Sequence, residues 1–248
     1  MSSRISTCGT AVLVLAMACG AASATVRPKI DQDVYRTAVS LAAGHPNERA
    51  RWHGLWNYSN GQDKAARKYF EQAAYYGDKP SQYVLTVMSW TGEGGSKDPV
   101  QAYIWSDLAA ERGNHSKLLG IREYIWNSLT EEQRVQVAKL GPVYHQRYGD
   151  ATAMRRTSSQ IARFSRSRTG SRAGGDSGKM HIAFGAGTPL PKMGCEGTEQ
   201  DFSIAQKHVY GQERVDPRSY WAQQDVAMRS ILVGTVTVGE FKETIQRP

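Results

Sequence analysis

Cysteine is nearly missing from this chain, which has 248 residues and three cysteines. Cys8 and Cys19 lie near the amino terminus, and only Cys195 comes later. One cysteine cannot form an internal disulfide bond, so the small disulfide-rich folds are excluded. The six histidines are scattered, and no HExxH or CxxC spacing occurs, so no zinc site is predicted. We therefore expect side-chain packing alone to hold the fold.

Long apolar runs are missing as well, and no stretch is suited to span a bilayer. The apolar residues 11–18 follow Arg4 and precede the sequence AASA, which ends at Ala24. A positive start, a short apolar core and a small-x-small end are typical of a secretory signal peptide. We predict a signal peptide over residues 1–24, cleaved after Ala24, and export to the periplasm or the medium. Lipid attachment at Cys19 is the alternative.

Motifs of catalysis and cofactor binding are absent too. The sequence GDSG at residues 175–178 resembles the nucleophile motif of chymotrypsin-like proteases. However, Lys179 stands where that motif continues with glycine, and no histidine has a fitting context for a general base. The sequence GAGTPLPKMG lacks the GK[ST] end of a phosphate-binding loop. We predict no catalytic, metal-binding or cofactor-binding residue, and a protein that is not an enzyme.

The chain does contain two similar copies of one predicted helix. The segment KDPVQAYIWSDLAAERG, residues 97–113, follows the similar KAARKYFEQAAYYG, residues 64–77, at an offset of 36 residues. A fixed period of this size indicates a solenoid of stacked repeats. The matched pairs are Ala66 and Ala102, Tyr69 and Trp105, Ala73 and Ala109, Ala74 and Ala110, and Gly77 and Gly113.

The second copy has the start and stop signals of a complete helix. Asp98 can cap the amino end, Pro99 suits the first turn, and Gly113 allows a left-handed stop. Ala102 and Trp105 share a face, on which alanines let a neighbouring helix approach closely. A partner helix is predicted before each copy, and further helices should cover the ends of the stack. The predicted ranges are 48–58 and 81–90 for the partners, then 31–44, 115–129 and 131–141, the last ending at Gly141-Pro142.

This pattern resembles the Sel-one-like repeat family, a tetratricopeptide-like group of alpha-alpha solenoids. The resemblance covers roughly residues 31–150 and implies an all-α repeat domain that serves as an adaptor or scaffold for protein complexes, here in a bacterial envelope. The residues that carry it are Gly92, Gly94, Asp98, Ala102, Trp105, Ala109, Ala110 and Gly113.

Aromatic residues on the repeat are candidates for contact with a partner, because solenoids present concave surfaces. Packing between helices is the alternative for each of these side chains. The candidates for binding another protein or peptide are Tyr58, Tyr75, Tyr76, Tyr83 and Trp90.

The basic charge of the chain is concentrated after the repeat. The net charge is +8, and residues 151–179 alone contain seven basic side chains and one acid. This Ser/Arg/Gly-rich segment is predicted to be a disordered linker. Weak attraction to an anionic membrane surface or an acidic envelope polymer is the alternative function, whereas nucleic acid is not expected as a partner of an exported protein. The tail, residues 180–248, is predicted to hold a short helix over 216–232 and a strand over 231–241.

Overall fold

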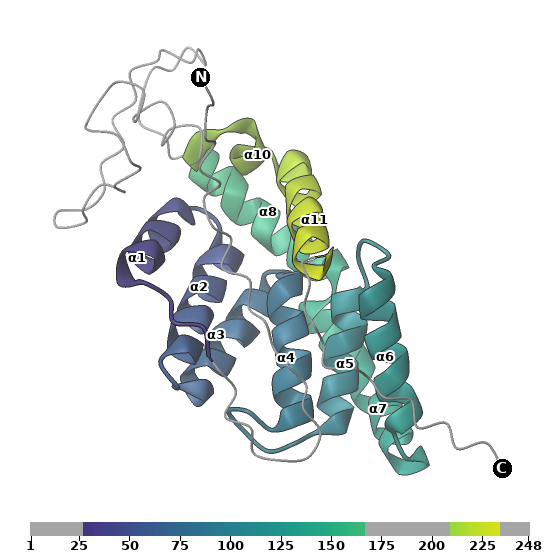
Figure 1. Ribbon diagram of the computed structural model, residues 1–248. Helices are drawn as coiled ribbons and strands as arrows, with labels where there is room; N and C mark the ends of the chain where they lie inside the picture. The colour runs from purple at the N-terminus through teal and green to yellow at the C-terminus, as the bar shows by residue number, and fades with distance from the viewer. Residues whose placement is uncertain (1–26, 167–208, 234–248) are drawn as a thin grey trace, which may run out of the picture.

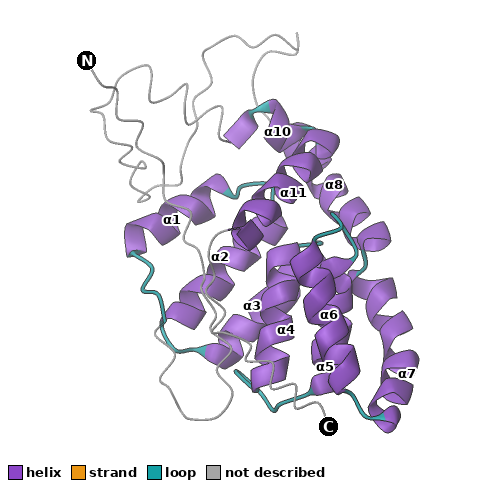
Figure 2. Cartoon of the chain, turned by 45° about the vertical axis from the view of Figure 1, so that its right-hand side comes forward, coloured by secondary structure: helices purple, strands orange, loops and turns teal. Residues whose placement is uncertain are grey.

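The computed structural model describes residues 27–166 and 209–233, and within these ranges the chain is helical, without a strand (Figures 1 and 2). The predicted signal peptide, Ser177 and Cys195 lie outside the described residues. No helix in the described part of the chain is both long and apolar enough to cross a membrane. The prediction of an all-α, repeat-like fold is confirmed.

Consecutive helices from α1 to α6 pack side by side in a stack, and α7 packs on α5 (Figure 1). The carboxy-terminal helix α11 returns across the stack and lies beside α8. The helices are α1 (Gln32–Leu41), α2 (Pro46–Ser59), α3 (Asp63–Tyr75), α4 (Lys79–Thr91), α5 (Pro99–Ala110), α6 (Ser116–Ser128), α7 (Glu131–Tyr148), α8 (Asp150–Arg166), α10 (Gln212–Val215) and α11 (Pro217–Val233).

The second repeat copy forms the centre of the core. Asp98 caps α5 by accepting a hydrogen bond from the Gln101 backbone N–H at 2.9 Å. Trp105 is 1% exposed, and its ring meets Tyr144 and Tyr148 of α7 edge-on. The alanines Ala66, Ala73, Ala74, Ala102 and Ala109 are fully buried, and Ala110 is 6% exposed. Close approach of the helices is therefore built on the small residues that recur in the sequence.

The turn before α5 depends on two glycines in the left-handed region. Gly92 has φ +88° and ends α4, and Gly94 has φ +72°. A β-carbon at Gly94 would lie 2.6 Å from the Asp63 carbonyl oxygen, so this turn packs directly on the start of α3. Gly77 and Gly113, with φ +79° and +87°, lie just after α3 and α5.

The first copy differs from the second at its aromatic position. Phe70, not Tyr69, lies in the core with no exposed surface, and a β-carbon at Gly54 would meet the Phe70 ring at 2.6 Å. Tyr69 is only half-buried and lines a cavity. The expectation that Tyr69 fills the same place as Trp105 is therefore wrong by one residue.

The predicted stop at Gly141-Pro142 is also wrong, because α7 continues to Tyr148. Pro142 is exposed, so water can satisfy the carbonyl group that loses its backbone donor. Beyond the proline, Tyr144 and Tyr148 lie 5.4 and 4.9 Å from the Trp105 ring, measured between centroids. Packing against this tryptophan holds the last turns in place.

The prediction of a disordered linker is wrong for residues 151–166, which form most of α8. Ala153, Thr157 and Ile161 recur every four residues and are buried, and Ile161 clusters with Tyr220 and Trp221 of α11. The partner surface comes from a distant part of the chain, so the linker composition concealed it. Residues 167–179 lie outside the described residues.

The carboxy-terminal helix agrees with prediction, since α11 spans Pro217–Val233. The strand predicted over residues 231–241 is wrong for residues 231–233, which are the last turn of this helix. Its remaining residues lie outside the described ranges.

Candidate functional site

Two adjoining cavities lie along α3, and Gln72 and Tyr76 belong to the walls of both. We call the pair the tyrosine groove. The first cavity has a volume of about 420 Å³ and lies between α2, α3, α8 and the corner before α2. The second has a volume of about 390 Å³ and lies between α3 and the end of α7. Tyrosines line both cavities: Tyr69, Tyr75, Tyr76 and Tyr148.

The first cavity combines small apolar residues with polar side chains. Ala42, Pro46 and Ala50 supply the apolar part of its lining. The polar part is Arg49, His53, Tyr69, Gln72 and Gln160, together with the buried His45. The Nδ1 atom of His53 lies 2.7 Å from the Tyr35 hydroxyl, and burial, followed by the charge of Arg49, lowers the pKa of His53. This imidazole is therefore biased toward its neutral form.

The second cavity is lined by charged side chains and by tyrosines whose rings contact arginine guanidinium groups. The Arg156 guanidinium lies 3.4 Å from the centre of the Tyr75 ring and donates to the Tyr75 carbonyl. The Arg147 guanidinium lies 5.3 Å from the centre of the Tyr148 ring. Both distances are typical of cation–π contacts. Lys68 and Glu71 complete the charged lining.

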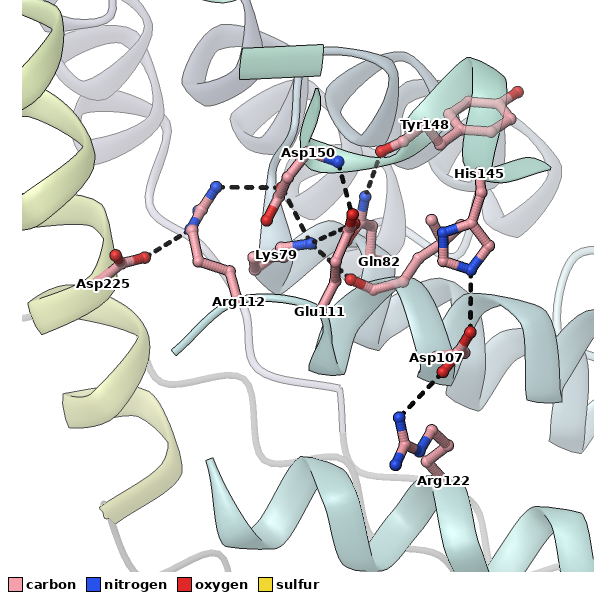
Figure 3. Close-up of polar contacts among 11 residues, drawn as sticks. Lys79, Gln82, Asp107, Glu111, Arg112, Arg122, His145, Tyr148, Asp150 and Asp225 are labelled. Carbon is pink, nitrogen blue, oxygen red and sulfur yellow. Dashed lines mark hydrogen bonds and ion pairs between the residues drawn. The ribbon is translucent and has the colours of Figure 1, made fainter. Parts of the chain in front are cut away.

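Buried ion pairs position the corner between α7 and α8, which forms one wall of the groove (Figure 3). The Lys79 side chain is 2% exposed, and its ammonium group lies 3.0 Å from Asp150 and 3.5 Å from Glu111. Burial lowers the pKa of Lys79, and the nearby carboxylate of Asp150 opposes that effect. The Gln82 side chain donates to the Tyr148 carbonyl at 3.1 Å. These contacts hold the segment that presents Arg147 and Tyr148.

The same network reaches α11. Arg112 lies 3.2 Å from Asp150 and 2.6 Å from Asp225, so it bridges the start of α8 to the carboxy-terminal helix (Figure 3). The Arg112 guanidinium also lies 4.7 Å from the centre of the Trp221 ring. Arg112 therefore joins α11 to the start of α8, next to the end of α7 that lines the groove.

A second buried network fastens α10 and α11 to α2 beside the first cavity. One carboxylate oxygen of Glu48 accepts from Arg214 at 2.7 Å, from the Tyr220 hydroxyl at 3.0 Å and from Gln224 at 2.9 Å. Burial alone would raise the pKa of Glu48, but the charge and hydrogen bond of Arg214, with the charge of Arg51, lower it to about 2. Glu48 is therefore ionised in the folded protein at neutral pH.

A third polar contact, between His145 of α7 and Asp107 of α5, lies outside the groove (Figure 3). The Nε2 atom of His145 lies 2.9 Å from Asp107, and the hydrogen bond between them raises the pKa of His145. Arg122 lies 3.1 Å from the same carboxylate. The group joins α5, α6 and α7. Among residues 27–166 and 209–233, no three His, Cys, Asp or Glu side chains are placed to hold a metal ion.

The aromatic residues predicted to bind a partner lie in different places in the structure. Tyr75 and Tyr76 line the tyrosine groove. Tyr58 is 1% exposed, and its hydroxyl group lies 3.1 Å from Glu93. Its assignment to a binding surface is therefore wrong, because the ring is packed in the core. Tyr83 and Trp90 are half-buried against the core and line neither cavity.

Several groove residues were not identified from the sequence. Arg147 and Tyr148 follow the proline that was expected to end their helix, and Gln160 belongs to the segment expected to be a linker. Arg49 belongs to no motif that the sequence analysis identified. The tyrosine pair at residues 75–76 was the only local signal that pointed to this region.

Comparison of the chain with family models, curated proteins and solved structures finds no match.

Proposed function

We propose that this chain is a non-catalytic, exported Sel-one-like repeat protein that binds a segment of another protein in the tyrosine groove. It would thereby act as an adaptor or scaffold in the cell envelope. The observation that supports this most is the pair of adjoining cavities along α3, which share Gln72 and Tyr76. An elongated depression of this kind suits an extended chain better than a compact small molecule.

The walls of the groove support binding because they are held before any partner arrives. Lys79, Asp150 and Gln82 fix the α7–α8 corner, and Glu48 fastens the carboxy-terminal helices beside the first cavity. A preorganised surface loses less conformational entropy on association, so more of the contact energy contributes to affinity. Tyrosine adds large, fairly rigid contact area with a polar hydroxyl.

Site-specific photo-crosslinking in cells tests the proposal. Gln72 is exposed and lies in both cavities, so a benzophenone amino acid at this position should capture a discrete partner protein. Gln136, exposed on α7 and in neither cavity, is the matched control position. Absence of any crosslinked protein at residue 72, or the same products from both positions, would contradict the proposal.

The alternative is a binder of anionic membrane surfaces that uses the outer side of α8. Arg155, Arg163 and Arg166 are exposed on this helix at spacings of eight and three residues, which places them on one side. Sedimentation with phosphatidylglycerol vesicles tests this function. Binding that is lost when all three arginines become glutamine, and that weakens with salt, would favour it over the groove.

A further inference from the structure

We infer that the tyrosine groove takes an acidic segment that inserts one bulky apolar side chain into the first cavity and pairs its carboxylates with Arg49, Lys68 and Arg147. This inference rests on the proposed function and specifies the chemistry of the partner. Charge, shape and the state of the tyrosine rings each support it.

The charge of the groove is positive. Arg49 lines the first cavity, Lys68 and Arg147 line the second, and all three residues are exposed. In the described part of the chain, none of the three has a carboxylate within ion-pair distance. Glu71 is the one acid in either lining, and it lies 3.4 Å from Arg67. A concave surface with an excess of positive charge attracts a ligand of negative charge.

The shape of the first cavity suits a large side chain. Its volume of about 420 Å³ falls within the range of about 300–1,000 Å³ that is usual for ligand pockets. Pro46 and the partly exposed rings of Tyr69 and Tyr76 provide apolar contact. Gln72 and Gln160 offer amide groups to a polar edge or to the partner backbone. An aromatic or long aliphatic side chain between two acidic residues matches this arrangement.

The tyrosine rings favour a peptide over a carbohydrate. Sugars bind on aromatic faces that no other group covers. The Arg156 guanidinium lies over the Tyr75 ring, and the Arg147 guanidinium lies over the Tyr148 ring. The Tyr69 ring lies 5.1 Å from the His53 ring, measured between centroids. These tyrosines therefore present hydroxyl groups and bound cations. Carboxylates are the natural acceptors for such donors.

Binding of synthetic peptides to the purified protein tests the inference. The probe is a fluorescent peptide with a central tryptophan flanked by glutamates, compared with the same peptide in which glutamine replaces each glutamate and with one in which serine replaces the tryptophan. We expect the acidic tryptophan peptide to bind most tightly and to weaken as salt is raised. Arg49→Gln, Lys68→Gln and Arg147→Gln should each weaken it about two- to five-fold, since each removes one exposed charge pair.

Arg163→Gln is the matched control, because Arg163 is an exposed cation that lines neither cavity. It should leave the affinity unchanged. If the glutamine peptide binds as tightly as the acidic one, or if Arg163→Gln weakens binding as much as Arg49→Gln does, the inference is overturned while the groove remains a peptide site. If no peptide binds, and residue 72 captures no protein in cells, the proposed function fails with it.

Discussion

Replacing Glu48 by glutamine should loosen the carboxy-terminal helices from the rest of the protein. Glu48 is 8% exposed and is the shared acceptor for Arg214, Tyr220 and Gln224. Glutamine keeps a similar shape but has no charge, so the Arg214 guanidinium, whose side chain is 11% exposed, would stay buried without its counter-ion. Such a loss is much more harmful than loss of a surface ion pair.

The magnitude follows from the pKa of Glu48, which is lowered from its ordinary value of 4.5 to about 2. A shift of this size corresponds to about 3 kcal/mol of the free energy of unfolding at neutral pH. Because the folded-state pKa is depressed, this contribution is complete above about pH 4.5 and is lost as the pH falls toward about 2. Glu48→Gln should therefore lower the free energy of unfolding by about 3 kcal/mol at pH 7, and the difference from wild type should shrink at acid pH.

Urea unfolding followed by circular dichroism measures this loss, and hydrogen exchange shows where it acts. Exchange should quicken first in residues 209–233. Glu131→Gln is the control, because the Glu131 side chain is 78% exposed and lies 3.6 Å from Arg134 at the surface, and it should change the free energy by less than about 0.5 kcal/mol. A loss below about 1 kcal/mol for Glu48→Gln, or equal losses for the two variants, would refute the reasoning.

Other substitutions test the repeat core, the turn and the histidine pair. Trp105→Ala should lower the free energy of unfolding by about 3–5 kcal/mol, since the ring is 1% exposed, and a loss below about 1 kcal/mol in urea unfolding would contradict its place in the core. Gly94→Ala should destabilise by at least about 1 kcal/mol more than Gly61→Ala; both glycines have positive φ, but only at Gly94 would the β-carbon meet backbone, so equal losses would argue against the tight turn. The hydrogen bond to Asp107 raises the pKa of His145, so the stabilisation from this pair is complete below the ordinary histidine value of 6.5 and is lost as the pH rises through the raised value. Wild type should accordingly exceed Asp107→Asn in stability by more near about pH 6 than in alkaline solution, where only the pair with Arg122 remains, and a constant difference across that range would exclude the pairing with His145.

The sequence by itself determined the helices of the repeat and their ends. Asp98 caps α5 as its position predicts, and Gly113 adopts the left-handed conformation expected after this helix. The recurring alanines and Trp105 are buried at the spacing that the 36-residue offset indicates. These features depend on interactions within one or two turns of helix, so short stretches of sequence contain the information that specifies them.

Only the tertiary structure decided the tyrosine groove and the state of the segment after the repeat. Composition predicted a disordered linker where α8 forms, because the helix is stabilised by Tyr220 and Trp221, more than fifty residues away in the chain. Tyr69 and Phe70 exchange roles because the packing of α2 on α3, with Gly54 against the Phe70 ring, selects which aromatic turns inward. Likewise, Arg49 and Arg147 reach one groove only once α2, α3 and α7 are packed. Periodicity records which face of a helix is buried, whereas the partner of that face depends on contacts between distant segments.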